Sequence, residues 1–574
     1  MSRTTILRSL RPGGRAAVAL TVAVLAMTVL PLLAPQLTLR FVDDAIAGGS
    51  TGHLTLLAAG YLGLALAAQV ARTVTAWLAN RLAWDGTNRL RERVAGHALS
   101  LDMGYHSRRT PGELIERVDG DVVAVADFAV AFLLDVVASV LLLAGVVVIV
   151  FTIDVRLGLA LAAFCVLVFF GMTWTQRLAV PSATASRAAM ATLTGNLEEQ
   201  LAGVEDIRAN GAGRHVLRTF QRISGAWYRA EFRGARIGSA LLAGTSVAFA
   251  AGTALMLGLA AWLQASGRLT VGTAVLLLQY TLMVRTPFER LIEQMRHFQA
   301  ALAGLARLGD LLAERPALPE PAAPQTLPPG PLSLRLAGVG FRYAPGDPPA
   351  LADVTLDLAP GETLGVVGRT GSGKSTLARL VLRLYDPGTG TVEVGGRDLR
   401  TVGAAALRTR IGVVTQDVQL FDASVRENLT LFRTGGPGAE DARLLAVLAE
   451  VGLADWLAGR PEGLDSRLGA VSAGEAQLLA FARALLADPG LVVLDEPSSR
   501  LDPATERRVE DCIDRLLTGR TGILIAHRLS CLARVDKIAV LAGGRIVEYG
   551  YRADLAADPG SRFARMLDLA GAAR

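Results

Sequence analysis

The run GRTGSGKST at residues 368–376 gathers three glycines, one lysine and several hydroxyl side chains. Glycines let backbone N–H groups approach an anion closely, because no Cβ stands in the way. Lys374 supplies a compact charge suited to β- and γ-phosphates, and the Ser375 hydroxyl suits Mg²⁺. The run therefore predicts a nucleotide-binding loop. Its predicted contacts are Gly368, Thr370, Gly371, Ser372, Gly373, Lys374, Ser375 and Thr376.

Lysine is almost absent from this chain, which makes its place in the loop informative. Lysine and arginine together number 58, and only Lys374 and Lys537 are lysines. A planar guanidinium does not replace a compact ammonium beside a phosphate. We therefore interpret Lys374 as a residue retained for its chemistry.

The elements around the loop predict where the phosphates lie. TLGVVG (363–368) has the pattern of a buried strand, and KSTLARLVLRL (374–384) has the pattern of a helix whose N-terminus would face phosphate. LVVLDEP (491–497) ends a second such strand at two acids. Ligands of open α/β sheets bind at the carboxyl ends of strands. There Asp495 suits Mg²⁺ held through water, and Glu496 suits activation of an attacking water.

The first half of the chain is too apolar for a soluble domain. Hydrophobic residues make up 51% of the chain and charged residues only 19%, and the apolar excess precedes the loop described above. A helix that spans a bilayer needs about 20 apolar residues. We interpret the first apolar stretch as a retained helix rather than a cleaved signal. The six predicted spans are approximately 16–38, 54–78, 127–151, 157–174, 238–262 and 271–288.

Arginine placement predicts the orientation of these spans. Arginines crowd the two long segments that follow the second and fourth spans, and they are sparse in the other connections. The positive-inside rule then puts the N-terminus, both long segments and the C-terminal half in the cytoplasm. The same placement explains the net charge of +6 without a nucleic-acid partner. We predict an integral protein of the inner membrane of a bacterium.

A proline-rich segment divides the chain. Seven of the 24 prolines lie in residues 314–331, and such a segment is extended and semi-rigid. Beyond it, strand and helix patterns alternate, which predicts an α/β domain with a largely parallel sheet. The predicted fold class is an α-helical six-span membrane domain with long cytoplasmic helical extensions (1–312), a linker (313–332) and an α/β P-loop NTPase nucleotide-binding domain (333–574).

The α/β half resembles the nucleotide-binding domain of ABC transporters, and the whole chain resembles an exporter-type half-transporter. Several motifs in family order carry the resemblance: FRYAPG, VVTQD, SSRLD and ILIAHRL. The resemblance implies that Tyr343 stacks on adenine and that Gln416 reads Mg²⁺. It implies that Asp502 communicates across a dimer and that His527 senses the γ-phosphate. ATP and Mg²⁺ are the implied ligands.

One motif departs from the family pattern. The family signature L-S-G-G-Q is VSAGE here, with Ser472, Gly474 and Glu475 as the predicted phosphate contacts. Ser472 and Glu475 also form the S-x-x-E pattern of a capping box that opens the next helix, so pure capping is the structural alternative. A carboxylate at position 475 would weaken a phosphate contact. The loop ahead of the signature is also shorter than in the family, which puts normal coupling in doubt.

The resemblance also implies an assembly of two chains, because the family's signature contacts ATP bound to the opposite subunit. Residues 100–110 and 205–213 are the implied tips of the helical extensions, which dock onto nucleotide-binding domains. The predicted partners are a second half-transporter, identical or different, the lipid bilayer and an unknown transported substrate.

We therefore predict an ATP-driven exporter subunit with ATPase activity. One alternative is an importer built on the exporter fold. A second alternative is an ATP-gated channel or regulatory subunit, which single-channel recording would reveal. The cysteines have no metal-ligand spacing and are interpreted as core residues: Cys165, Cys512 and Cys531.

Two charges fall inside predicted spans. Arg72 and Asp135 both lie roughly 25 Å below the outer surface by helix rise. Intramembrane charges usually pair or face a cavity. One hypothesis is a salt bridge between them, and the alternative is independent solvation of Arg72 by lipid phosphates.

Overall fold

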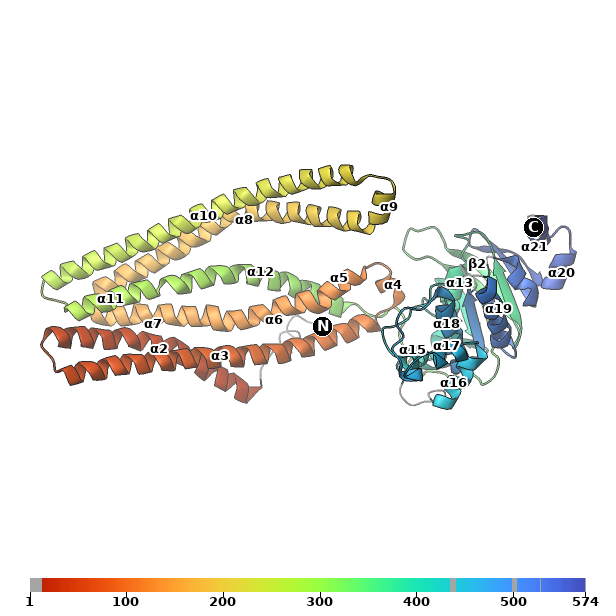
Figure 1. Ribbon diagram of the computed structural model, residues 1–574, viewed down its shortest axis with the longest axis horizontal. Helices are drawn as coiled ribbons and strands as arrows, with labels where there is room; N and C mark the ends of the chain where they lie inside the picture. The colour runs from red at the N-terminus through yellow and green to blue at the C-terminus, as the bar shows by residue number, and fades with distance from the viewer. Residues whose placement is uncertain (1–12, 434–439, 498–502, 527, 573–574) are drawn as a thin grey trace. The chain divides into compact units, whose positions relative to one another are not determined.

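The computed structural model describes residues 13–433, 440–497, 503–526 and 528–572 (Figure 1). Contacts divide the chain into two compact units. The helical unit comprises Met1–Leu99 and Thr110–Glu314, and the α/β unit comprises Ser100–Arg109 and Arg315–Arg574.

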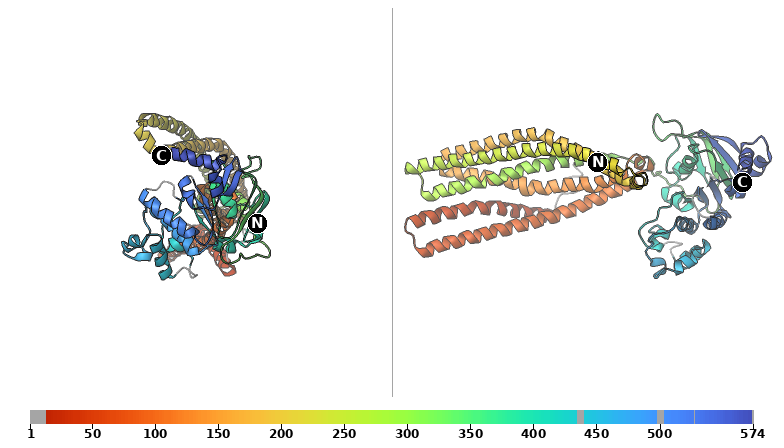
Figure 2. Two further views of the ribbon diagram at one scale, coloured as in Figure 1. Left: turned by 90° about the vertical axis from the view of Figure 1, so that its right-hand side faces the viewer. Right: turned by 45° about the horizontal axis from the view of Figure 1, so that its top comes forward.

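The helical unit consists of long helices that run side by side (Figure 1, Figure 2). Two π-helical turns, η1 (Glu116–Asp121) and η2 (Phe132–Val137), join α5, α6 and α7 into one continuous helix. The helix bounds are α2 Gly14–Ile46, α3 Thr51–Ser100, α5 Pro111–Ile115, α6 Val122–Ala131, α7 Ala138–Ile153, α8 Val155–Ala202, α9 Val204–Ala209, α10 Gly213–Ala265, α11 Val271–Met283 and α12 Arg285–Ala313.

The predicted spans can be compared with the observed helices by their position and length. Within the described residues, five helices are long and apolar enough to cross a membrane, and the first five predicted stretches lie within them. The stretch 271–288 is divided at Val284 between α11 and α12, and α11 alone has 13 residues. The sixth apolar stretch therefore reaches bilayer length only when α11 and the start of α12 are taken together.

The helices pack through an apolar core in which a buried tyrosine hydroxyl connects two of them. Tyr280 of α11 is fully buried, and its hydroxyl donates to the Leu32 carbonyl oxygen of α2 over 2.7 Å. The Gln36 side chain donates in turn to that hydroxyl over 3.1 Å. A buried hydroxyl needs such partners, because leaving it unpaired costs free energy. These contacts join α2 and α11.

The proposed salt bridge between Arg72 and Asp135 is wrong. Asp135 lies in the π-helical turn η2 and pairs with Arg290 of α12 at 3.5 Å. The Gln294 amide also donates to the Asp135 carboxylate over 3.0 Å. Asp135 thus finds its partners on α12, because that helix packs against η2, whereas Arg72 lies elsewhere in the helical unit.

The two tips of the helical extensions belong to different units. Residues 100–109, which include the short helix α4 (Met103–His106), cluster with the α/β unit. Their anchor is Asp102, whose carboxylate accepts a hydrogen bond from the backbone N–H of Ala317 over 2.7 Å. The other tip, α9, stays with the helical unit, where it joins α8 to α10 (Figure 1).

The α/β unit contains two sheets. A six-stranded sheet has the order β10-β9-β3-β8-β7-β6, and a four-stranded antiparallel sheet has the order β2-β1-β4-β5. The strands are β1 Leu334–Phe341, β2 Leu351–Leu358, β3 Thr363–Val367, β4 Thr389–Val394, β5 Arg397–Asp398, β6 Ile411–Val414, β7 Leu491–Asp495, β8 Thr521–Ile525, β9 Lys537–Ala542 and β10 Arg545–Tyr551.

Helices cover the six-stranded sheet and complete two apolar cores. One core lies between this sheet, the four-stranded sheet and α13, and the other lies between this sheet and helices α15 to α19. The helix bounds are α13 Lys374–Val381, α14 Ala404–Arg410, α15 Val425–Thr430, α16 Asp441–Glu450, α17 Ala454–Ala458, α18 Ala473–Ala487, α19 Pro503–Leu517, α20 Arg552–Ala557 and α21 Arg562–Ala572. Strands β9, β3, β8, β7 and β6 are parallel, so their carboxyl ends share one edge.

The proline-rich segment is bound to the α/β unit along its length. The backbone of Gln325 exchanges hydrogen bonds with Thr401 and Gly403. Farther along, the Arg410 guanidinium donates to the Pro328 carbonyl oxygen, and the Leu332 N–H donates to Gly490. The segment is irregular, as expected for its prolines, but these contacts fix its path over the α/β unit.

Candidate functional site

The nucleotide-binding loop follows β3 and opens α13. Gly368 and Gly373 are crowded by backbone, since a Cβ on Gly368 would lie 2.3 Å from the Leu541 carbonyl oxygen and one on Gly373 would lie 2.7 Å from that of Ala350. Gly371 faces open space, and its φ is +80°. The glycines therefore serve two purposes: Gly368 and Gly373 permit close packing of the loop, and Gly371 and Gly373 permit its left-handed turns.

Lys374 lies inside the loop rather than beside it. Its side chain is buried, and its ammonium donates to the Gly368 carbonyl oxygen at 2.8 Å and to that of Arg369 at 3.3 Å. The Ser372 hydroxyl is also buried and has no hydrogen-bond partner among the described residues. A buried cation and an unpaired buried hydroxyl in one loop are the polar groups that an anionic ligand would satisfy.

The acids predicted at the end of β7 lie beside this loop. β7 is fully buried up to Leu494, and the Ser375 hydroxyl donates a hydrogen bond to the Asp495 carboxylate. The Asp495 Oδ1 atom is buried without a partner. Burial raises the pKa of Asp495, and the neighbouring charge of Glu496 raises it further. The unfavourable charge on this carboxylate would be relieved by a cation.

Glu496 adopts an unusual backbone conformation. Its φ is +50°, and its N–H donates to the Ile525 carbonyl oxygen of β8 over 3.0 Å. A non-glycine residue in the left-handed region costs about 1–3 kcal/mol and persists only where the surroundings enforce it. The hydrogen bond to β8 fixes this turn, and the turn places the second acid directly after Asp495.

Tyr343 contacts the loop, and Gln416 follows another strand of the same sheet. Gln416 is exposed and follows β6, at the same sheet edge as Asp495. The Tyr343 hydroxyl lies 3.0 Å from Thr376 Oγ1 and accepts a hydrogen bond from Arg379 over 2.9 Å. Tyr343 is 41% exposed, and the Arg379 guanidinium lies over its ring at 5.9 Å from the centroid.

The variant signature forms the predicted capping box. Ser472 is the N-cap of α18, and its hydroxyl accepts a hydrogen bond from the Glu475 N–H over 3.2 Å. The Glu475 carboxylate accepts one from the Ser472 N–H over 2.7 Å. Gly474 packs against α19, since a Cβ there would lie 2.4 Å from the Thr505 methyl carbon. The first turn of α18 therefore satisfies two of its own N–H groups.

Two predicted site residues, Asp502 and His527, lie outside the described residues. The strand ahead of His527 is β8, which ends at Ile525 on the edge shared with β3 and β7.

The second lysine of the chain serves a structural purpose. Lys537 begins β9, and its ammonium pairs with Glu362 at 2.8 Å. The same ammonium lies over the rings of Tyr549 and Tyr551, at 5.9 and 5.2 Å from their centroids. Charge pairing and cation–π attraction explain this position.

Family profiles match both halves of the chain. The profile described as "ABC transporter transmembrane region" matches residues 18–288, and the profile described as "ABC transporter" matches residues 351–499. The chain is 31% identical over 502 residues to an ATP-dependent lipid A-core flippase of Thiobacillus denitrificans, covering 86% of this chain and 84% of the relative. The chain belongs to the ABC transporter family.

Further comparisons agree with this membership. The chain is 32% identical to the cyclolysin secretion/processing ATP-binding protein CyaB of Bordetella pertussis, covering 94% of this chain and 76% of the relative. A solved structure of a bacterial Atm1-family ABC exporter with ATP bound superposes with a TM-score of 0.81 at 27% identity, covering 97% of this chain and 98% of the other.

The ABC transporter assignment confirms the predicted fold class and general activity. The chain is an exporter-type subunit that binds ATP and couples ATP hydrolysis to transport. It is an integral protein of a bacterial inner membrane, and half-transporters of this kind generally form dimers.

Sequence reasoning missed Tyr385 of this ABC transporter, a residue that packs against Tyr343. The Tyr385 ring lies edge-on to Tyr343 with centroids 5.4 Å apart. A Cβ on Gly104 of α4 would lie 3.7 Å from the Tyr385 ring. Within the α/β unit, Tyr385 thus stands between the extension tip and Tyr343. In the sequence, Tyr385 could be noticed only as an aromatic residue that follows α13 by four positions.

Proposed function

We propose that two chains of this type, identical or different, form an exporter that holds two ATP molecules between paired α/β units. The observation that carries this proposal is the meeting of Lys374, Ser375, Asp495 and Glu496 at one sheet edge, in a chain that also has membrane-spanning helices. Each pair of α/β units would then present the loop of one chain to the α18 N-terminus of the other.

The roles of the site residues follow from their chemistry. Backbone N–H groups of the loop, with Lys374, would bind the β- and γ-phosphates. Tyr343 would stack on adenine, and Ser472 with Gly474 would face the ATP of the partner. Glu496 would accept a proton from the attacking water, with His527 at the γ-phosphate. Asp502 would respond across the dimer.

A Mg²⁺ ion fits the same edge. The unpaired Oδ1 atom of Asp495 and the Ser375 hydroxyl are oxygen ligands of the kind that Mg²⁺ prefers, directly or through water. Gln416 would add its amide oxygen. Bound Mg²⁺ neutralises charge on transferring phosphoryl groups. The residues of this chain hold the phosphates in place and position the water.

Outward transport is the direction that the relatives favour. The printed names of two relatives include a flippase and a secretion protein, and the structural neighbour is an exporter. We propose that the N-terminus and the α/β unit are cytoplasmic, because arginines concentrate in the long segments on that side. ATP closure of the α/β units would open the helices outward, and hydrolysis would reset them.

Trapping and electrical recording test this function. The full chain with Glu496→Gln, purified in nanodiscs, should retain two ATP molecules per pair of chains, whereas the wild type should hydrolyse MgATP. Planar bilayers that contain the wild type should show no single-channel currents with ATP. Monomers that retain ATP would contradict the paired site, and ATP-gated currents would favour the channel alternative.

A further inference from the structure

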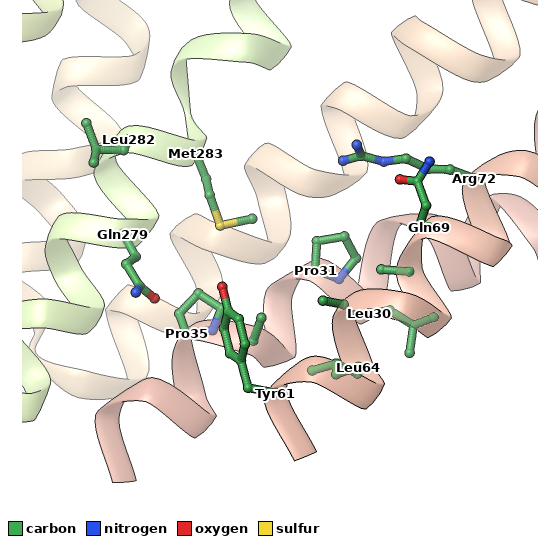
Figure 3. A pocket seen from close by; sticks show the side chains of 13 residues that line it. Leu30, Pro31, Pro35, Tyr61, Leu64, Gln69, Arg72, Gln279, Leu282 and Met283 are labelled. Atoms are coloured by element: carbon green, nitrogen blue, oxygen red, sulfur yellow. The ribbon is translucent and has the colours of Figure 1, made fainter. Parts of the chain in front are cut away.

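A cavity of about 440 Å³ lies within the helical unit, between α2, α3 and α11 (Figure 3). Its walls are mainly apolar. They include Pro31 and Pro35 of α2, Leu64 of α3, and Leu282 and Met283 of α11. Small-molecule sites are typically clefts of about 300–1,000 Å³ with apolar walls and a few polar groups. The cavity has the size and lining of such a site.

A single charge enters this cavity. Among the described residues that line it, Arg72 is the only one with a formal charge. The described part of the chain offers its guanidinium no ion pair and no hydrogen-bonded acceptor. An arginine within a membrane-spanning helix is costly unless an acceptor or water satisfies it, and such residues usually mark substrate paths. The partner of Arg72 is therefore expected to come from outside the chain.

The only formally charged residue among the described residues of the lining, Arg72, lies at one end of the cavity, whereas the polar groups of Gln279 and Tyr61 lie farther along it. Arg72 and Gln69 lie together at one end of the cavity, and Tyr61 lies on the same helix toward the other end (Figure 3). Helix rise puts Tyr61 and Arg72 about 16 Å apart along α3. Between them, α3 contributes Leu64 and small alanines. The cavity thus matches a ligand whose charge is at one end.

Two of the three walls are fixed to each other. The buried Tyr280 hydroxyl joins α11 to α2, as described above. At the other end of these helices, the Asp43 carboxylate accepts hydrogen bonds from the Gly272 N–H over 2.8 Å and from the Thr270 hydroxyl over 2.7 Å. By contrast, none of the apolar window of α3 is buried within the chain. Within a single chain, the wall that carries Arg72 is therefore exposed over its apolar window.

We propose that this cavity binds an amphipathic anion, namely an apolar body with one acid group, and that the acid group pairs with Arg72. The proposal rests on the proposed exporter function, of which it names the substrate class. The planar guanidinium pairs with carboxylate or phosphate oxygens through two parallel hydrogen bonds. The Gln69 amide is placed to donate beside it, and the apolar walls bury the body.

Binding to the full chain tests this proposal without nucleotide. The chain in phosphatidylcholine nanodiscs is titrated with dodecanoate and with dodecanol as the neutral analogue. Arg72→Gln should weaken dodecanoate binding about 10- to 100-fold, the range for loss of a charged hydrogen-bond partner, and leave dodecanol unchanged. Arg72→Lys keeps the charge but not the two parallel hydrogen bonds, so it should weaken dodecanoate binding less than Arg72→Gln does. Arg81→Gln, on the same helix but outside the cavity, is the matched control.

A second pair of variants tests the cavity independently, in case Arg72→Gln fails to fold. Leu64→Trp should fill the cavity and abolish dodecanoate binding, whereas Leu66→Trp, at a residue 59% exposed and outside the cavity, should not. Equal binding of dodecanol and dodecanoate, or unchanged dodecanoate binding by Arg72→Gln or Leu64→Trp, would overturn the proposal. Failure of the exporter function would appear separately, as absent MgATP hydrolysis.

Lipid composition distinguishes the two sources of such an anion. Replacing part of the phosphatidylcholine by phosphatidylglycerol should compete with dodecanoate if the bilayer supplies the ligand, and this competition should disappear in Arg72→Gln. Dodecanoate binding that is indifferent to phosphatidylglycerol would identify a free single-chain acid. Both results support an amphipathic anion at Arg72.

Discussion

The N-termini of α13 and α18 are the two helix ends at which we propose phosphate contacts, yet their first-turn N–H groups are capped differently. Gly373 is the N-cap of α13 and offers no side chain, so the first turn has no side-chain cap. Ser472 and Glu475 cap α18 reciprocally. Helix α13 also begins with the Lys374 cation, whereas α18 has a carboxylate in its first turn. The two ends therefore differ in both available donors and charge.

The α13 loop therefore has buried polar groups that a ligand would pair, whereas the first-turn N–H groups of α18 are already paired by its own side chains. The loop at α13 leaves a buried hydroxyl and a buried carboxylate oxygen without partners, which favours nucleotide binding. The capping box of α18 stabilises the helix by itself, and Glu475 opposes an incoming anion. ATP should therefore bind first to α13 and gain less from α18 than an uncharged signature would give.

The largest effect is expected at Glu496. Glu496→Gln should keep MgATP bound at the α13 loop but reduce turnover about 10²- to 10⁴-fold, the usual loss for a general base. Steady-state ATPase assays and nucleotide binding measure the two quantities separately. Near wild-type hydrolysis by Glu496→Gln would remove this residue from the reaction and leave the α13 site as a binding site only.

Lys374→Arg should rank next. The substitution keeps the charge but changes its shape and hydration, and the broader guanidinium has to replace a buried ammonium that donates to the Gly368 carbonyl oxygen. Nucleotide affinity and turnover should both fall by about tenfold or more, since each 1.4 kcal/mol lost is tenfold. Arg369→Lys, at an exposed loop position, is the control. If Lys374→Arg hydrolysed ATP with unchanged kinetics, the lysine at the start of α13 would not be what distinguishes this helix end from the capped end of α18.

Variants of Glu475 test directly whether the charge at the N-terminus of α18 makes it differ from that of α13. Glu475→Gln retains the capping box, because glutamine also serves at this position, but removes the negative charge. ATP affinity should improve about two- to fivefold, as expected for removing roughly 0.3–1 kcal/mol of unfavourable charge at a helix N-terminus. Glu475→Ala should instead lose about 0.5–2 kcal/mol of stability with the cap. Equal ATP affinity in all three proteins would mean that α18 does not meet phosphate.

The smallest predicted effect concerns Asp495 and pH. Its raised pKa means that the folded protein binds a proton more tightly than the unfolded chain. The free energy of unfolding should therefore fall as pH rises from about 4, the ordinary value, through the raised pKa. Asp495→Asn should remove this slope and raise Tm at pH 7.

Thermal unfolding of the nucleotide-free chain at pH 4 to 8 measures that slope directly. Asp347→Asn, at an exposed loop position of the same unit, controls for a general charge effect. A steeper pH dependence in Asp495→Asn would show that another group dominates.

Local patterns determined the chemistry of this protein from sequence alone. The loop at 368–376, the acids after β7 and the capping box at Ser472 each depend on neighbours a few residues apart, so the sequence predicted their local form. Parallel strands then bring the ends of β3 and β7 to one edge, which is why Asp495 could be assigned to the loop. Long apolar runs likewise identified the membrane helices.

Tertiary structure alone decided the pairings between distant elements. Asp135 pairs with Arg290 rather than Arg72, because the angle and register of helix packing select among partners that sequence makes equally plausible. The same holds for the anchoring of Asp102 on Ala317 and for the proline-rich segment, whose composition predicts an extended chain but not the surface that binds it. The cavity at Arg72 likewise depends on tertiary structure, because α11 lies beside α2 and α3, which precede it by about 170 residues or more.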